Sequence, residues 1–475
     1  MRFLKSIRPS HVGLATIHIW IYCITHRPSM PDEVSFMAVM YLALSACLAL
    51  VAAAALRRAL SEETKRLIDW PAAACMAAAA LLGALPASDV RAATAAALLG
   101  GVGVGWAYMR WGEFYARLDI HYAAPLVFFT MAVGSVGKTA VDFLPPVFAA
   151  PVLALLPAAV FFLARRSLAS APEAPEPSRY YNGRTVGSLR RLVLGIAVYS
   201  LIVGVIQSMF LERIPSPYHV AVLIHHGGEI VLASGLLLWV TLLKRGLNFS
   251  RTWRLVLVLM ATSLIFAPYL EEVMGGYLFA LVRIAQTFLI VFLFLALSDV
   301  ARHSVYRPMA VFAAGWLAYA LPFAVGKAAG DSLAALGPNA SAVMSLAVWV
   351  LVVATLFFLD ESSAGSHVVF TELNDGGDED TLAKRMNAVQ QSLDAREDRD
   401  PLALRCEAVT RDYGLTPRES EILELLARGR SKAYIADAFF ISENTVRGHV
   451  KRVYAKLGVH SKQELLDTVE SALPR

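Results

Sequence analysis

The feature that most constrains this chain is a series of long apolar runs, each near the length that crosses a lipid bilayer. A hydrocarbon layer of about 30 Å takes about 20 mostly apolar residues in a helix, because the backbone polar groups must be satisfied within the segment. Hydrophobic residues make up 57% and charged residues 17% of the 475 residues, which excludes a purely soluble enzyme, a disordered chain and a fibrous protein. Twelve runs are predicted, near residues 11–26, 34–56, 68–85, 92–109, 121–137, 143–164, 192–210, 219–243, 253–270, 273–298, 308–326 and 340–359.

The loops between these runs differ in basic charge. With the N-terminus inside, the inside segments hold 21 Lys and Arg residues and the outside loops hold 5. Because cytoplasmic loops are enriched in Lys and Arg, this asymmetry predicts a multi-pass protein of the inner (cytoplasmic) membrane with both termini in the cytoplasm. No small-residue cleavage site follows the first run, so we interpret it as a retained span and not as a removed signal peptide.

The longest internal loop, residues 167–191, divides the predicted spans into two sets of six. Residues 1–166 would form an N-terminal six-span bundle, and residues 192–359 a second one. Two six-span bundles joined by a cytoplasmic loop resemble the major facilitator superfamily in layout. The Gly-x-x-x-Asp-Arg-x-Gly-Arg-Arg signature of that family is not matched by Leu56–Arg66, so the resemblance is one of layout alone.

Several polar residues fall inside the predicted spans, where a charge costs about 2.5–3.5 kcal/mol on insertion scales. One interpretation is a ligand pocket in the second bundle, in which Arg283 meets a carboxylate or a phenolate. The other is an Arg283–Glu229 ion pair that fixes helix packing, with the histidines as satisfied interior groups. The candidate pocket residues are Arg283, Glu229, His226 and Gln207, with His225 and Gln286 beside them.

Motifs for enzymatic chemistry are not recognisable in the sequence. The Gly-x-x-x-Gly spacing of Gly101 and Gly105 favours close helix packing over a phosphate loop, because it opens no βαβ unit. The four cysteines fit no metal or redox spacing and are interpreted as packing residues. We therefore expect no enzyme, no cofactor and no bound metal.

Residues 360–412 change abruptly in character, with 13 acidic and 6 basic residues. Such a segment buries too little apolar surface to order itself, and we interpret it as an acidic linker. Within it, Leu382, Met386, Val389 and Leu393 recur at intervals of 4, 3 and 4 residues. This pattern fits a short dimerising helix, or equally an amphipathic helix that covers the next domain.

Residues 413–475 predict four short helices. Thr416 can cap the first, with Pro417 at its first position and Glu419 completing a capping box. The second begins near Ser431, and after a tight turn at 440–441 the third begins at Ser442. On the third helix one stripe repeats at intervals of 4, 3 and 4 and should be buried: Val446, Val450, Val453 and Leu457.

The other face of this third helix is basic, with small residues between the charges. Such a face suits a helix that enters the major groove of DNA, whereas a basic face alone is more often only solvated. Two preceding short helices and a tight turn favour DNA binding, with Arg447 and Lys451 one turn apart and within reach of base edges. The predicted DNA-binding residues are Ser442, Thr445, Arg447, Gly448, Lys451, Arg452 and Lys456.

The motif blocks from Leu415 to Val459 closely resemble the LuxR-type helix-turn-helix family. The resemblance implies sequence-specific binding of promoter DNA as a homodimer. It also implies base-reading positions at Arg447, Gly448 and Lys451, although Gly448 replaces the larger residue that is commoner there. From the fourth helix it implies a dimer contact through Leu465, Leu466 and Val469.

The whole chain therefore predicts an all-α protein: a polytopic membrane bundle of about twelve spans, followed by a cytoplasmic four-helix LuxR-type domain. The layout resembles membrane-integral LuxR-type regulators. The predicted function is a one-component transcriptional regulator of the lipid bilayer that answers an unknown small-molecule effector. The alternative is a transporter like those of the major facilitator superfamily, with a fused DNA-binding reporter domain.

Overall fold

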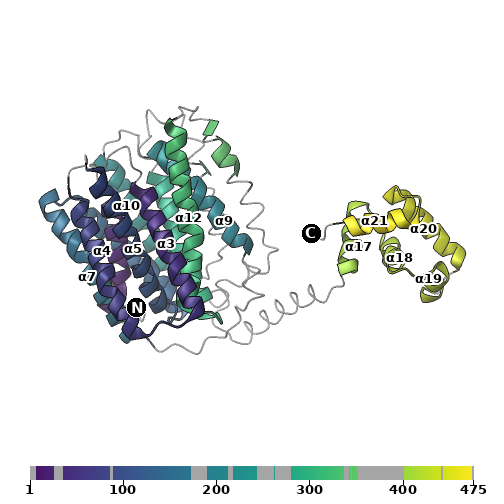
Figure 1. Ribbon diagram of the computed structural model, residues 1–475, viewed down its shortest axis with the longest axis horizontal. Helices are drawn as coiled ribbons and strands as arrows, with labels where there is room; N and C mark the ends of the chain where they lie inside the picture. Colours follow the sequence, from purple (N-terminus) through teal and green to yellow (C-terminus); the bar gives the residue numbers. More distant parts are fainter. Residues whose placement is uncertain are drawn as a thin grey trace. The chain divides into compact units, whose positions relative to one another are not determined.

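The chain forms two compact units, Met1–Met386 and Asn387–Arg475 (Figure 1). The structure is a computed structural model. It describes residues 7–25, 36–85, 89–172, 190–211, 218–242, 261–262, 280–335, 342–343, 345–350, 353, 401–439 and 442–472. The seam Leu382–Leu393, the turn at 440–441 and most of the predicted spans 253–270 and 340–359 lie outside these residues.

The first unit is a bundle of membrane-length helices. Among the residues that the structure describes, seven helices are long and apolar enough to cross a membrane, so the chain is a multi-pass membrane protein. The count of twelve spans and their division into six and six stay predictions. The described elements are η1 (Pro9–Gly13), α2 (Leu14–Thr25), α3 (Phe36–Arg57), α4 (Glu62–Leu82), α5 (Val90–Tyr115), α6 (Ile120–Asp142), α7 (Pro146–Ala169), α9 (Arg190–Ile206), the π-helix η2 (Gln207–Leu211), α10 (Tyr218–Thr241), the helix Ala280–Arg302 and α12 (Pro308–Ala335).

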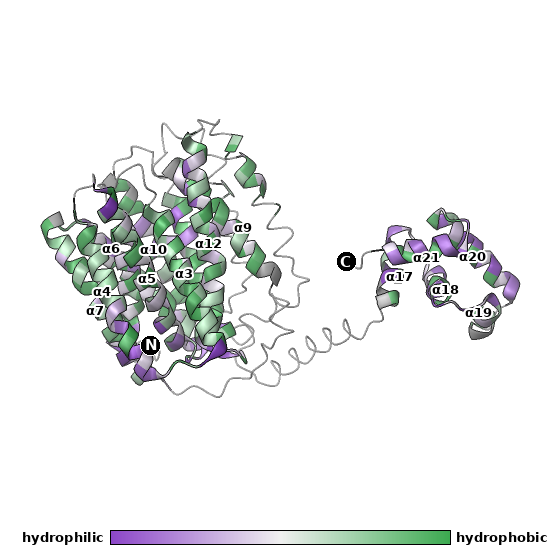
Figure 2. Cartoon of the chain, viewed as in Figure 1, coloured by the Kyte–Doolittle hydropathy of each residue, from purple (hydrophilic) through white to green (hydrophobic). Residues whose placement is uncertain are grey.

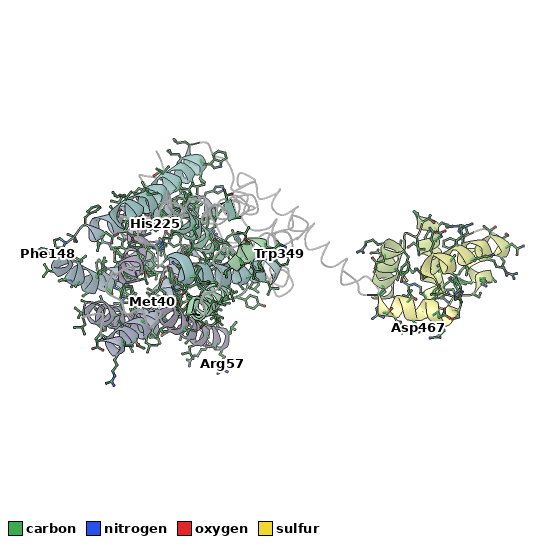
Figure 3. The ribbon with its side chains drawn as sticks, turned by 90° about the horizontal axis from the view of Figure 1, so that it is seen from above. Met40, Arg57, Phe148, His225, Trp349 and Asp467 are labelled. Atoms are coloured by element: carbon green, nitrogen blue, oxygen red, sulfur yellow. The ribbon has the colours of Figure 1, made fainter. Side chains whose placement is uncertain are left out.

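The outer faces of this bundle are apolar, as expected for a surface that meets lipid (Figure 2). Leu50, Leu155 and Val231 are each more than 70% exposed although they are aliphatic. Figure 3 shows Phe148 and Trp349 at the periphery of the bundle and His225 inside it.

Several helices cross at glycines. A Cβ atom on Gly101 would lie 2.2 Å from the carbonyl oxygen of Met40 on α3, and one on Gly105 would meet Cys47. The close packing predicted from the Gly101–Gly105 spacing is confirmed. Gly326 of α12 and Gly204 of α9 make a second such crossing, which the sequence analysis did not identify.

Helix α4 begins at Glu62, six residues before the predicted run, because its polar first turns are satisfied. Ser61 caps the helix by accepting a hydrogen bond from the Thr64 amide. Asp69, only 1% exposed, accepts hydrogen bonds from Trp106 and Arg165, at 2.8 Å each, and lies 3.2 Å from Nε of Arg110. This network joins α4 to α5 and α7.

Four cations that the sequence analysis counted in loops belong instead to helices. Lys65, Arg110, Lys138 and Lys327 are all buried in α4, α5, α6 and α12. Each lies near the end of a helix that is longer than the apolar run that predicted it. The runs marked the lipid-facing lengths of these helices and missed their polar, protein-facing ends.

The second unit is a small helical domain with its own core. Its helices are α17 (Pro401–Asp412), α18 (Pro417–Ala427), α19 (Lys432–Ala438), α20 (Glu443–Leu457) and α21 (Lys462–Ser471). The four predicted helices are confirmed. Helix α17 was not predicted; it lies in the segment interpreted as linker, and it adds Cys406 and Val409 to the core.

Candidate functional site

Helix α20 is held by local contacts that leave one face open. Ser442 caps it by accepting a hydrogen bond from the Thr445 amide at 3.2 Å, and Gly458 ends it at a φ of 70°. The predicted stripe is confirmed as buried: Val446, Val450, Val453 and Leu457 are at most 7% exposed. The core therefore takes one side of α20 and turns the other to solvent.

Two basic side chains stand on the open face. The Arg447 side chain is 64% exposed and lies 3.6 Å from Glu443, a pair on one helix that adds little stability. Lys451, one turn further, is exposed and has no ion-pair partner among the residues that the structure describes. Gly448 lies between them, and a Cβ atom there would meet nothing within 4 Å. This face has the charge and the narrow profile that a major groove admits.

Lys456 and Arg452, two of the predicted DNA-binding residues, contact a carboxylate of their own domain. The Lys456 ammonium donates to Glu419 at 2.7 Å and to the Gly414 carbonyl at 3.0 Å, and Arg452 Nε lies 3.5 Å from Glu419. The Lys456 hydrogen bond and the Thr416 amide hold the pKa of Glu419 at about 2. Glu419 also completes the predicted capping box with Thr416, which is confirmed. These contacts tie α20 to α18.

The predicted dimer residues of α21 also make contacts within their own domain. Leu465 and Val469 are 0% exposed and belong to the domain's own core, while Leu466 packs partly against it. Leu465 and Val469 therefore have no surface to offer a second copy while the domain stays folded. The exposed positions of α21 are Lys462, Gln463, Glu464, Asp467, Glu470 and Ser471.

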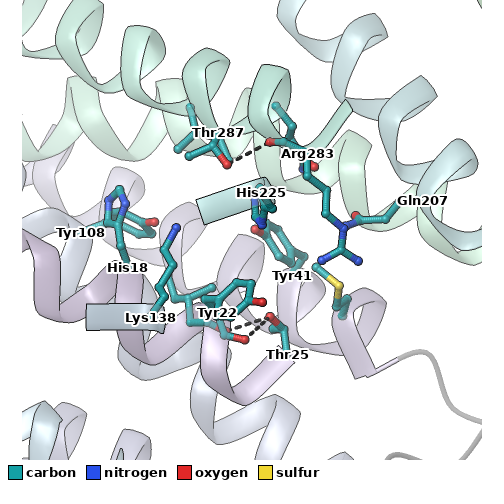
Figure 4. Close-up of a pocket in the computed structure, with 14 residues that line it drawn as sticks. His18, Tyr22, Thr25, Tyr41, Tyr108, Lys138, Gln207, His225, Arg283 and Thr287 are labelled. Carbon is teal, nitrogen blue, oxygen red and sulfur yellow. Dashed lines mark hydrogen bonds between the residues drawn. The ribbon is translucent and has the colours of Figure 1, made fainter. Parts of the chain in front are cut away.

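A cavity of about 110 Å³ lies inside the first unit (Figure 4). A cavity needs roughly 10–15 Å³ to hold one water molecule, so this cavity has room for several waters and therefore for a small organic molecule. Arg283 and Gln207, two of the predicted pocket residues, line this cavity together with His225. The residues that sequence reasoning missed come mainly from the first half of the chain: His18, Tyr22, Tyr41, Tyr108 and Lys138.

Glu229, another predicted pocket residue, is bound by Lys138 and not by Arg283. The Lys138 ammonium lies 2.9 Å from Glu229 Oε2, Ser135 donates to the same oxygen at 2.6 Å, and His225 Nε2 lies 3.2 Å from Oε1. The predicted ion pair between Arg283 and Glu229 is therefore wrong, because the cation that pairs with Glu229 is Lys138. The apolar Ala140 and Val141 after Lys138 were the signal that its helix continues.

His226 lies beside this cluster. Its Nδ1 is 2.9 Å from the Thr139 hydroxyl of α6, and its ring packs edge-on against Tyr22, with the ring centroids 4.6 Å apart. Together with Lys138 and Glu229, it joins α6 to α10 through polar contacts. These helices belong to the two predicted halves of the bundle.

A capped helix with an open basic face, in a chain whose other unit is a bundle of membrane-length helices, defines a multi-pass membrane protein with a helix-turn-helix domain. Residues 414–469 match the family described as bacterial regulatory proteins, luxR family. The spore germination protein GerE of Bacillus subtilis (strain 168) is 44% identical over 50 residues, which are 10% of this chain and 68% of GerE. The chain belongs to the luxR family through this domain.

Other relatives match in the same domain alone. The response regulatory protein YgeK of Escherichia coli (strain K12) is 40% identical over 73 residues, 14% of this chain and 50% of YgeK. An HTH-type transcriptional regulator of Mycobacterium tuberculosis (strain ATCC 25618 / H37Rv) is 43% identical over 53 residues, 11% of this chain. The chain spans only 6% of the length of that regulator.

Solved structures match the membrane region. The proton:xylose symporter XylE of the major facilitator superfamily is 15% identical, with a TM-score of 0.47, over 77% of this chain and 94% of the symporter. A bacterial homologue of the iron transporter ferroportin has a TM-score of 0.50 and 10% identity, over 74% of this chain and 99% of that one. At this identity the latter likeness shows the fold alone. The predicted combination of a LuxR-type domain with a membrane region of many helices is confirmed.

Proposed function

We propose that this protein is a membrane-bound, one-component transcriptional regulator that binds promoter DNA through α20 in response to a small molecule held in its membrane unit. The observation that carries this proposal is the exposed pair Arg447 and Lys451 on the helix that the family uses to bind DNA. On DNA we expect a homodimer, as the family implies. We expect no enzymatic activity and no cofactor.

The orientation of the chain is part of the proposal, and contacts at one end of the bundle support it. Arg307 donates to the Ala55 carbonyl at 2.5 Å, Arg302 to the Arg117 carbonyl at 3.2 Å, and Arg165 to the Arg66 carbonyl at 2.5 Å. Basic residues from five segments thus gather at the same end. Since basic residues favour the cytoplasmic side, this end faces the cytoplasm with both termini. A reporter enzyme fused to Arg475, active only in the cytoplasm, tests this orientation.

DNA binding is tested by footprinting the full-length protein on its own promoter region. Lys451→Ala should change the preference at one base pair by about 1–3 kcal/mol. Lys456→Ala is the matched control on the same helix, because its ammonium binds Glu419. We expect the control to lower the stability of the domain and to leave base preference unchanged. An identical footprint and affinity for Lys451→Ala and wild type would contradict the proposal that α20 enters the major groove.

Sensing is tested by transcript profiling and by a promoter reporter across candidate inducers. Arg283→Gln should abolish the response at normal protein level, because Arg283 lines the cavity. An intact response in that variant would reduce Arg283 to a packing role.

A transporter with a fused DNA-binding domain is the second candidate, and the transporter fold of the membrane unit favours it. Its distinguishing property is net movement of solute. Accumulation of a labelled inducer in vesicles that contain the purified chain would support transport. A reporter response without accumulation would support sensing alone.

A further inference from the structure

Two cations line the membrane cavity, one from each predicted half of the bundle. Lys138 reaches it from α6, and Arg283 from the helix Ala280–Arg302 (Figure 4). The Lys138 ammonium also lies 5.5 Å from the centre of the Tyr22 ring. A cationic ligand would meet repulsion here, whereas an anionic group could contact both halves at once.

Lys138 is engaged by a carboxylate of its own chain. Its partner, Glu229 of α10, is 0% exposed, and their contact joins α6 to α10. The lysine stem is flexible, so its ammonium can turn from one oxygen partner to another without movement of the backbone. Glu229 would keep its hydrogen bond from Ser135 at 2.6 Å after such a turn, and His225 Nε2 would stay 3.2 Å from Oε1. Lys138 can therefore bind either the Glu229 carboxylate or the carboxylate of a ligand in the cavity.

The rest of the cavity wall suits a planar apolar body. Tyr22, Tyr41 and Tyr108 line it from α2, α3 and α5. Aromatic walls favour offset or edge-on contact with another ring. A ring that carries one anionic group would therefore use both the aromatic and the cationic parts of the wall.

We propose that the cavity binds a small aromatic carboxylate, which replaces Glu229 on Lys138 and so releases the polar tie between α6 and α10. This inference rests on the proposed function, in which occupancy of the cavity changes the state of the membrane unit. It adds the ligand class and the contact through which binding acts: Glu229 is the internal competitor of the ligand.

The test uses benzoate as the probe and benzamide as its neutral counterpart, with binding to the full-length protein in nanodiscs measured by calorimetry. Glu229→Gln removes the competitor, so benzoate should bind about tenfold more tightly or better, a gain of about 1.4 kcal/mol, and benzamide should not gain. If Glu229 served only in packing, its loss would weaken benzoate binding or leave it unchanged. Either result, or no benzoate binding in any variant, overturns the inference.

A second variant guards against misfolding and against a general loosening of the site. Lys138→Gln combined with Glu229→Gln removes both charges of the pair, and it should lose at least the tenfold gain of the single variant. If the double variant keeps that gain in affinity, Glu229 and benzoate do not compete for Lys138, and the inference is overturned.

The promoter reporter separates this inference from the proposed function. Tighter benzoate binding in Glu229→Gln without any reporter change would uphold the ligand class and overturn sensing. A reporter response to benzoate in wild type, with no gain of affinity in Glu229→Gln, would uphold sensing and overturn the competition.

Discussion

Two buried carboxylates, Glu229 in the membrane unit and Glu419 in the DNA-binding domain, are each bound by a lysine, yet their surroundings differ. Glu229 is 0% exposed and its lysine 5%, and the two residues are 91 positions apart in the chain. Glu419 is 3% exposed, but the Lys456 side chain that binds it is 36% exposed. Glu419 also caps its own helix.

The difference teaches how each unit is held together. In the DNA-binding domain, water reaches the lysine, and the carboxylate would keep its capping contact if that lysine were removed. In the membrane unit, the pair joins two helices that are distant in the sequence, and its carboxylate is 0% exposed. Removing the lysine of such a pair should therefore cost much stability in the membrane unit and little in the DNA-binding domain.

The largest expected effect comes from removing the membrane lysine. Lys138→Met leaves the Glu229 carboxylate buried without its cation, which should cost about 3–5 kcal/mol. Lys138→Met combined with Glu229→Met should regain most of this loss. The measurement is the thermal unfolding temperature in detergent. Arg428→Met, which breaks an exposed pair with Glu424, is the surface control and should cost at most about 1 kcal/mol. Equal effects of Lys138→Met and Arg428→Met would contradict the comparison.

A glycine at a helix crossing should give the next largest effect. A Cβ atom on Gly326 would lie 2.1 Å from the carbonyl oxygen of Leu201, so Gly326→Ala must push α9 and α12 apart, at about 1–3 kcal/mol. Gly227→Ala on α10 is the control, because its Cβ atom would meet nothing within 4 Å. The same unfolding assay separates them: only Gly326→Ala should unfold at a lower temperature. A matching decrease in Gly227→Ala would mean that the crossing is not responsible.

The Lys456–Glu419 ion pair should give a smaller effect on stability, and this effect should depend on pH. Because the pKa of Glu419 is lowered from 4.5 to about 2, its ionised form stabilises the domain. That contribution is fully present above pH 4.5 and is lost as the pH falls toward 2. Glu419→Gln should cost about 1 kcal/mol at neutral pH and progressively less in acid.

The readout is hydrogen exchange of α18 and α20 peptides in the full-length chain, with variant and wild type compared at each pH. Glu421→Gln is the control, since the Glu421 side chain is 53% exposed in its pair with Arg418. A difference between Glu419→Gln and wild type that stays constant down to pH 2 would exclude Glu419 as the titrating group.

Features that depend on contacts within one helix could be predicted from the sequence, whereas contacts between helices could not. The cap at Thr416 and the buried stripe of α20 rest on contacts within four residues, so spacing alone identified them. Contacts between helices could not be predicted in this way. The hydrogen bond from Lys456 to Glu419 was missed because the two residues are 37 positions apart in the sequence. Helix α17 escaped as well, because the acidic composition around it resembled a linker.

In the membrane unit, length and hydropathy located the described helices, since each must span the same hydrocarbon layer. They could not tell which polar residues meet. An apolar helix in lipid shows little difference between its faces, so Arg283 and Glu229 seemed natural partners by charge alone. Lys138 was assigned to a loop, and the cavity wall of His18 and three tyrosines was missed, because those residues are distant in sequence.

An effect of opposite sign is expected at Gly448 of α20. A glycine inside a helix costs about 1 kcal/mol relative to alanine, and here a Cβ atom would meet nothing within 4 Å. Gly448→Ala should therefore slow hydrogen exchange of α20 about fivefold, the reverse of Gly326→Ala. Operator affinity measured on the same protein gives the reason for the glycine. If exchange slows while affinity falls, the glycine is kept so that the α20 backbone can approach the base edges. If exchange is unchanged or faster, the face beside Arg447 and Lys451 is not the open surface described above.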